Sequence, residues 1–226
     1  MKLTDKVKSL KSERYFCDTA YRGSIGIYQG MALNFAYAAF RAFMGIRYLS
    51  YWFISSAVYY FVMGMIRAML AHSYRRKNAA GGFAYEKRCY RRTAWLLFIL
   101  NIPIGGMIVI MMTHMNPSGS YPMYTIYASA AYTFYAVTVS AMNIAKFRKI
   151  CSPILSASKA VNFAAALMSL LGLQNALISE FSGGDEDFRI LMNRLTGAGV
   201  YIAVMAMAIY MIAVSKNRRK GENTGE

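Results

Sequence analysis

Basic residues in this chain fill every second gap between its apolar stretches. They gather in the first 22 residues, across 73–92, around 146–149 and after 215. The gap at 115–121 (MNPSGSY) contains no Lys or Arg. Because short loops rich in Lys and Arg stay on the cytoplasmic side of a bilayer, this alternation predicts an integral membrane protein whose basic gaps all lie on one side.

The apolar stretches between these gaps are long enough to cross a bilayer, since a helix needs about 20 apolar residues to span the hydrocarbon core. They lie at about 24–46, 49–72, 93–114, 122–143, 153–177 and 195–215. We therefore predict an all-α integral membrane protein with six transmembrane helices and both termini cytoplasmic (N-in/C-in), because this arrangement places every basic block on one side. The whole chain, 1–226, then forms a single multi-pass domain of the plasma membrane.

The segments outside the spans differ in charge. The first 22 residues lack the apolar core of a signal peptide and form a cytoplasmic segment, either a short amphipathic helix on the inner surface or a solvated tail. Residues 73–92 form a basic cytoplasmic loop and 216–226 a cytoplasmic tail. The external loop at 178–193 is acidic, which agrees with the topology but adds little to it, because Asp and Glu have little influence on orientation.

The formal charge of +16 raises the question of a nucleic-acid partner. Nucleic-acid binding requires cations and aromatic residues on one folded face, whereas here the aromatics lie within the spans and the cations between them. We therefore expect no nucleic acid. We expect instead an attraction of the cations to anionic lipid headgroups, at about 1 kcal/mol per cation near the membrane.

The cysteines and histidines do not form the pattern of a disulfide or metal site. Cys17, Cys89 and Cys151 all map to the cytoplasmic side, where thiols stay reduced, and no two of them form a CxxC pair. His72 and His114 fall on opposite sides of the membrane and cannot share a metal. We predict neither a metal nor a cofactor.

A weak internal repeat emerges when the chain is shifted by 103 positions against itself. The matches include Arg91 with Arg194, and small apolar residues of 55–70 with those of 158–173. Two halves of three spans each would have opposite orientations, which is the 3+3 inverted-repeat plan of several transporter folds. Small apolar residues also match by chance, so a repeat and a chance match both stay open.

Polar residues inside the spans are candidates for a functional site, because they usually face the bundle interior or a water-filled cavity. Asn34, Tyr37 and Arg41 follow the i, i+3, i+7 spacing of one helical face. Asn101 is followed closely by Pro103, whose missing N–H frees a carbonyl and kinks a helix. The candidates for a solute-binding site are Asn34, Tyr37, Arg41, Tyr60, Asn101, Lys159 and Asn162.

Packing alone also explains polar residues in membrane helices, because Asn, Ser and Tyr hydrogen-bond between helices for about 0.6 kcal/mol on average. Three cations, Arg41, Arg67 and Lys159, lie within a few turns of a span end, so their charged heads can instead snorkel to the interface. In the last span Gly199, Ala203 and Ala206 share one face, which predicts close helix packing through small residues.

The sequence does not contain the residues that several kinds of chemistry require. The spans contain no Asp or Glu, which argues against proton or sodium coupling through an intramembrane carboxylate. The motifs HExxH, GxSxG and GxxxxGKS/T are absent, and no His lies at mid-depth to serve as the base for a nucleophile. A lipid-processing site built on Glu86 with Arg88 or Arg91 is a weaker alternative, so an enzyme is not the class that we favour.

Cations without intramembrane carboxylates favour an anionic or a neutral hydrogen-bonding solute over a metal cation. The sequence therefore points to a transporter or a membrane substrate-binding subunit for such a solute. The alternative is a non-transporting assembly factor, sensor or partner subunit. It would work through the basic cytoplasmic surface and bind a membrane or ATPase partner subunit.

Overall fold

The computed structural model describes residues 19–76, 82–113, 123–146, 152–181 and 186–223. Within these residues the chain forms six α-helices: α2 (Thr19–Tyr48), α3 (Tyr51–Arg76), α4 (Gly82–Thr113), α5 (Met123–Lys146), α6 (Pro153–Phe181) and α7 (Glu186–Asn223). The shortest, α5, has 24 residues. At about 1.5 Å per residue even this helix exceeds the hydrocarbon thickness of about 30 Å. Most of the predicted N-terminal segment, with Cys17, His114 and Cys151, lies outside the described residues.

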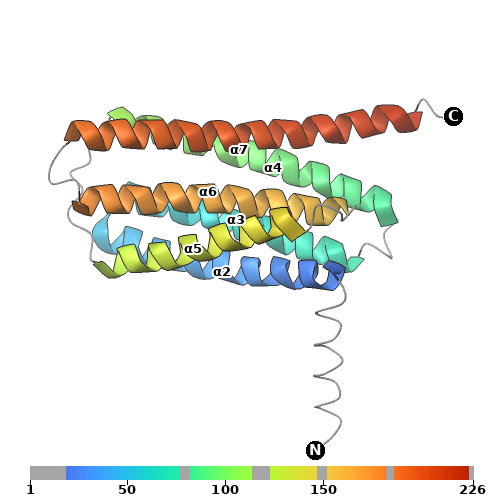
Figure 1. Cartoon of the computed structure of the whole chain (residues 1–226), viewed down its shortest axis with the longest axis horizontal. Coiled ribbons are helices and arrows are strands. Elements are labelled where there is room, and N and C mark those ends of the chain that lie inside the picture. Colours follow the sequence, from blue (N-terminus) through green and yellow to red (C-terminus); the bar gives the residue numbers. More distant parts are fainter. Residues whose placement is uncertain (1–18, 77–81, 114–122, 147–151, 182–185, 224–226) are drawn as a thin grey trace, which may run out of the picture.

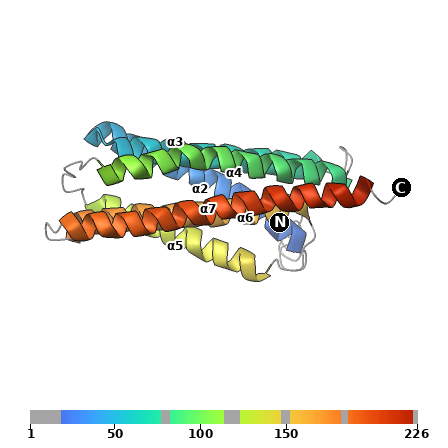
Figure 2. The same cartoon turned by 90° about the horizontal axis from the view of Figure 1, so that it is seen from above.

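The helices run up and down along one long axis, each antiparallel to the next in the chain (Figure 1). α2 begins and α7 ends at the same end of the bundle, as an even number of passes requires. The most extensive helix pairs are α2 with α3, α4 with α7 and α5 with α6. Seen from above, α5 is inclined to its neighbours (Figure 2). The all-helical prediction is confirmed, and each helix overlaps one of the predicted spans.

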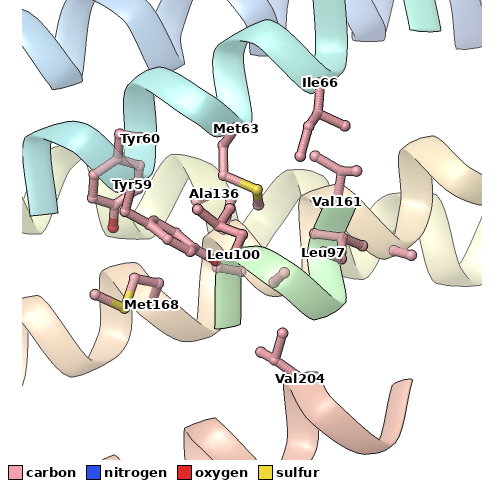
Figure 3. Packing of buried hydrophobic residues seen from close by; sticks show 14 of the residues in the cluster. Tyr59, Tyr60, Met63, Ile66, Leu97, Leu100, Ala136, Val161, Met168 and Val204 are labelled. Atoms are coloured by element: carbon pink, nitrogen blue, oxygen red, sulfur yellow. The ribbon is translucent and has the colours of Figure 1, made fainter. Parts of the chain in front are cut away.

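α6 is the central helix, because it contacts each of the other five described helices. Its packed faces carry small side chains, and Ala157, Ala164 and Ala165 are completely buried. Small residues let helix backbones approach closely without leaving voids. The remaining core is filled by larger side chains from the helices around it, including Met63 of α3 and Leu97 of α4 (Figure 3).

The outward faces of the bundle are apolar. Phe43 of α2 is 64% exposed, Phe134 of α5 72% and Ile202 of α7 64%. A helix of a soluble bundle places polar residues on its outer face. Large apolar side chains on the outside of helices from both ends of the chain are instead typical of a lipid-facing surface.

Three helical segments of the described residues are long and apolar enough to cross a membrane: Tyr51–Arg76, Pro153–Ile178 and Ile190–Ser215. α2 carries Arg22, Arg41 and Arg47, and α4 begins with several cations, which lowers the mean hydropathy of both. α5 is rich in Tyr, Ser and Thr but has no charge before Lys146. These properties indicate a membrane protein.

The helices extend beyond the predicted spans into segments that the sequence suggests are loops. α4 begins at Gly82, inside the predicted 73–92 loop, and α7 begins at Glu186, inside the predicted 178–193 loop. α7 also continues to Asn223, through most of the predicted tail. The physical reason is that Lys, Arg and Glu are good helix formers, so a drop in hydropathy marks the edge of the membrane and not the end of a helix.

The prediction that Gly199, Ala203 and Ala206 form a packed face of the last span is wrong. Gly199 and Ala206 are exposed, and no atom lies within 4 Å of the position that a Cβ on Gly199 would occupy. The buried face of α7 instead carries Val200, Val204, Ala208 and Met211. This face also has helical spacing, and its larger side chains remove more apolar surface on packing against α4 and α6.

α2 and α3 are joined by a tight turn in which Leu49 has a left-handed backbone with φ of 48°. The Ser50 N–H donates to the Gly45 carbonyl at 3.1 Å and so closes the end of α2. This is the C-terminal position where glycine is usual, because an L-residue loses about 1–2 kcal/mol in the left-handed region.

Replacing Leu49 with glycine is therefore expected to stabilise the protein by about 0.5–1 kcal/mol, after subtraction of the extra chain entropy of glycine. Leu49 is 83% exposed, so little packing is lost. Thermal unfolding of the detergent-solubilised protein measures the change. Leu49→Ala keeps the strained backbone and is the control. A melting temperature no higher for Leu49→Gly than for Leu49→Ala would contradict the assignment of strain.

Candidate functional site

The buried face of α2 carries three of the predicted site residues. Asn34 and Arg41 are each only 1% exposed, and Tyr37 is 5% exposed. Their spacing of three and four residues places them one above another along a single helical face. They point into the bundle toward α3, α5 and α6, so the structure brings them together as a stripe about 10 Å long.

Arg41 lies in the interior of the bundle, and its side chain does not reach the bundle surface. Its Nε and Nη2 atoms both donate to the Tyr37 hydroxyl, at 2.9 and 2.6 Å. Its guanidinium carbon lies 5.0 Å from the ring centre of Phe53 on α3. On α6, a Cβ added to Gly172 would lie 2.8 Å from Nη2, so this glycine makes room for the cation. Arg41 is thus enclosed by three helices.

Tyrosine rings from α2, α3 and α5 form a compact cluster beside Arg41. Tyr37 and Tyr132 stack with ring centres 3.8 Å apart and planes 4° from parallel. Tyr60, a predicted site residue, meets both rings edge-on at 4.7 and 5.3 Å. The two edge-on pairs add about 0.5–1.5 kcal/mol each beyond their buried area. We call Tyr37, Tyr60 and Tyr132 the tyrosine cluster.

Hydrogen bonds connect this cluster to α5 across long sequence separations. The Tyr132 hydroxyl donates to Asn34 Oδ1 at 2.7 Å, and the Tyr37 hydroxyl donates to Ser129 Oγ at 3.3 Å. The Thr133 hydroxyl has one proton, which the carbonyls of Ser129 on α5 and Ser169 on α6 share at 2.7 and 3.1 Å. α5 therefore supplies a hydrogen-bond partner to both Asn34 and Tyr37 of α2.

The sequence-based prediction missed Tyr132 and Ser129. Both lie on one face of the 122–143 span together with Thr133 and Ala136, and all four are buried. Their i, i+3, i+4, i+7 spacing was a usable signal. Tyrosine and serine are common at interfaces and in helix packing, and this hid the pattern.

Arg67 does not snorkel, contrary to one of the alternatives drawn from the sequence. It is 5% exposed and lies against the backbone of α2. A Cβ added to Gly30 would overlap Arg67 Nη1, so the guanidinium occupies the space where any other residue would have a side chain. The absence of a side chain at Gly30 therefore determines where this cation rests.

Three buried donors in this region have no hydrogen-bond partner among the described residues: Asn34 Nδ2, Tyr60 Oη and Arg67 Nε. Tyr132 joins two of these residues, because its hydroxyl donates to Asn34 Oδ1 and its ring packs on Tyr60. A buried donor without an acceptor loses about 1–3 kcal/mol. Among the described residues, the acceptors Asn34 Oδ1 and the Tyr37 hydroxyl already accept bonds from Tyr132 and Arg41, and none meets these three donors.

Carboxylates that could balance the two arginines are absent from the surrounding sequence. No Asp or Glu occurs between Asp18 and Glu86, or between Glu86 and Glu180. Glu86 lies in the first turns of α4, where it accepts a hydrogen bond of 2.5 Å from Ser152 Oγ at the start of α6. The interior around the tyrosine cluster is therefore positively charged.

The remaining predicted residues lie on α4 and α6. Asn101 donates to the Tyr201 carbonyl at 3.1 Å, which is a packing contact between α4 and α7. Lys159 is partly exposed on α6, and Asn162, one turn later, is 4% exposed. The contacts of the tyrosine cluster involve Asn34, Tyr37, Arg41 and Tyr60, so these four form the centre of the candidate site.

The described residues hold no group of three or more His, Cys, Asp or Glu side chains placed to bind a metal ion. Cys89 is a free, buried thiol, and His72 is exposed near the end of α3.

No family model matches this chain, and a search of curated proteins finds no relative.

Proposed function

We propose that this chain crosses the plasma membrane six times with both termini in the cytoplasm. The ends of the bundle differ in charge, which supports this topology. Arg75 and Arg76 close α3, and Arg88, Arg91 and Arg92 lie in the first turns of α4, at the end of the bundle where α2 begins and α7 ends (Figure 1). All five are exposed. A cluster of exposed cations at one end is the feature that holds that end in the cytoplasm.

We further propose that the helices form a 3+3 inverted repeat. At the offset of 103 residues, the starts of α2, α3 and α4 correspond to positions 122, 154 and 185, and α5, α6 and α7 begin at 123, 153 and 186. The pairing of α2 with α3 matches that of α5 with α6. Three helices per half give the halves opposite directions, as in several transporter folds.

The function that we propose is binding and transport of an anionic or neutral hydrogen-bonding solute at the site between α2, α3 and α5. The observation that carries this proposal is the burial of Arg41 and Arg67 in an interior without carboxylates. An unbalanced buried cation costs several kcal/mol, and membrane proteins retain such residues mainly for function. A solute that accepts hydrogen bonds offsets this cost by meeting the unpartnered donors.

Substitution of Arg41 by Gln tests the proposal. Solute uptake into vesicles containing the purified protein, with acetate, phosphate, chloride and glycerol as probes, is expected to fall at least about tenfold for the transported probe, which corresponds to about 1.4 kcal/mol. Arg47→Gln is the matched control, because Arg47 lies on the same helix but is exposed. Unchanged uptake in a folded Arg41→Gln protein would exclude Arg41 from the site.

A second candidate function is that of a non-transporting partner subunit. The five exposed arginines at one end of α3 and α4 favour it, because they offer a basic surface to a soluble partner. Affinity purification of the full chain in a mild detergent distinguishes the two classes. Recovery of a stoichiometric ATPase, with no uptake by the protein alone, would favour the partner subunit.

A further inference from the structure

The two buried arginines, Arg41 and Arg67, differ in whether their Nε–H groups have a hydrogen-bond partner among the described residues. An arginine recognises a carboxylate or phosphate best through two parallel N–H groups, such as those of Nε and one Nη atom. In Arg41 this edge is already occupied, because Nε and Nη2 both donate to the Tyr37 hydroxyl. In Arg67 the Nε atom has no partner among the described residues, although the side chain is only 5% exposed.

The surroundings of Arg67 hold its guanidinium in place. Nη1 rests in the space above Gly30 on α2, so that end of the group is occupied by packing. Two further buried donors have no partner among the described residues: Asn34 Nδ2, one turn along α2 from Gly30, and Tyr60 Oη, two turns along α3 from Arg67. All of these groups can donate, and no described acceptor meets them. A ligand that presents oxygen acceptors would accept hydrogen bonds from such donors.

We propose that Arg67, seated on Gly30, is the anion receptor of this site and that its ligand is an oxyanion with two oxygens available to one guanidinium, as in a carboxylate or a phosphate. This inference rests on the proposed solute-binding function and narrows it, because it excludes neutral solutes and halides as the main ligand. Arg41, eleven residues from Gly30 and about 16 Å further along α2, holds Tyr37 in the cluster.

The test uses the purified full chain in detergent and measures its melting temperature with sodium acetate, sodium phosphate, sodium chloride or glycerol. Acetate or phosphate is expected to raise the melting temperature more than chloride at equal ionic strength, and glycerol at equal concentration is expected to have the smallest effect. Gly30→Ala is expected to abolish this preference, because its Cβ would occupy the position of Nη1. Gly26→Ala, one turn earlier on α2, meets no atom within 4 Å and is expected to keep it.

Arg67→Lys is the second variant, in case Gly30→Ala does not fold. Lysine keeps the positive charge but lacks the planar fork, so we expect it to bind chloride and acetate alike. If phosphatidylglycerol micelles raise the melting temperature and neither acetate nor phosphate does, the oxyanion belongs to a lipid headgroup. That result would overturn the proposal of a soluble ligand.

The other outcomes separate this inference from the proposed function. If Gly30→Ala and Arg67→Lys both keep the oxyanion preference while Arg41→Gln loses it, the receptor is Arg41 and the proposed function stands. If glycerol stabilises the wild-type protein and oxyanions do not, the inference fails and only a neutral solute remains. If no probe stabilises or enters vesicles, both proposals fail.

Discussion

Replacing Tyr132 with alanine is expected to destabilise the protein by about 3–5 kcal/mol, the range for loss of a large buried aromatic side chain. Tyr132 stacks on Tyr37, meets Tyr60 edge-on and hydrogen-bonds Asn34, so one substitution removes contacts of α5 with both α2 and α3. Denaturant unfolding in mixed micelles, followed by circular dichroism, measures the change. Solute-dependent stabilisation is expected to disappear with it.

Two further variants separate packing from hydrogen bonding. Tyr132→Phe keeps the ring stack but leaves Asn34 Oδ1 without its donor, for an expected loss of about 1–3 kcal/mol. Phe134→Ala, two residues later on α5, is the control, because Phe134 is 72% exposed and contributes little to the interior. A loss for Tyr132→Ala no larger than for Phe134→Ala would show that the tyrosine cluster does not hold α5 in place.

Replacing Gly45 with alanine is expected to destabilise the protein by about 1–3 kcal/mol through overpacking. The new Cβ would lie 2.7 Å from Ile54 Cγ1 and 2.9 Å from the Ile54 backbone nitrogen. A backbone atom cannot move away without shifting α3, so the clash separates α2 from α3 at their tight turn. Alanine is a better helix former than glycine by about 1 kcal/mol, so a measured loss underestimates the clash.

Gly26→Ala is the matched control for this effect, since it makes the same change on the same helix in open space. It is expected to be neutral or to stabilise the protein by up to about 1 kcal/mol. Because Arg41 lies one turn before Gly45 and contacts Phe53 next to Ile54, Gly45→Ala is also expected to weaken solute binding. If Gly45→Ala and Gly26→Ala have equal free energies of unfolding, α2 and α3 can separate at their turn without loss of stability, and the prediction of overpacking is wrong.

The sequence was most informative within single helices. The stripe of Asn34, Tyr37 and Arg41 could be predicted because residues on one face of a helix recur at three- and four-residue intervals. All three are buried in the structure, and Tyr60 of the next span lies against Tyr37. The same reasoning misplaced the packed face of α7, because both faces of that helix have helical spacing and periodicity alone does not say which one meets a neighbour.

Arg67 shows most clearly what sequence patterns could not reveal. Its position near a span end allowed both snorkelling and burial, and the outcome depends on Gly30, which is 37 positions away in the chain. In the same way, Gly172 on α6 makes room for the guanidinium of Arg41 on α2. A glycine that makes room for a distant cation leaves no local pattern, because its effect arises only when two helices come into contact.

The amino-acid sequence by itself determined the approximate positions of the helices, the stripe of Asn34, Tyr37 and Arg41 and the absence of carboxylates from the predicted spans, because hydropathy, helical period and composition are local properties. Only the tertiary structure decided that α5 completes the site and that α6 lies at the centre. The hydrogen bonds that join Tyr37 to Ser129 and Tyr132 to Asn34 connect residues 92 and 98 positions apart. Such contacts depend on which helix faces meet, and a face is chosen by the packing of all the helices together.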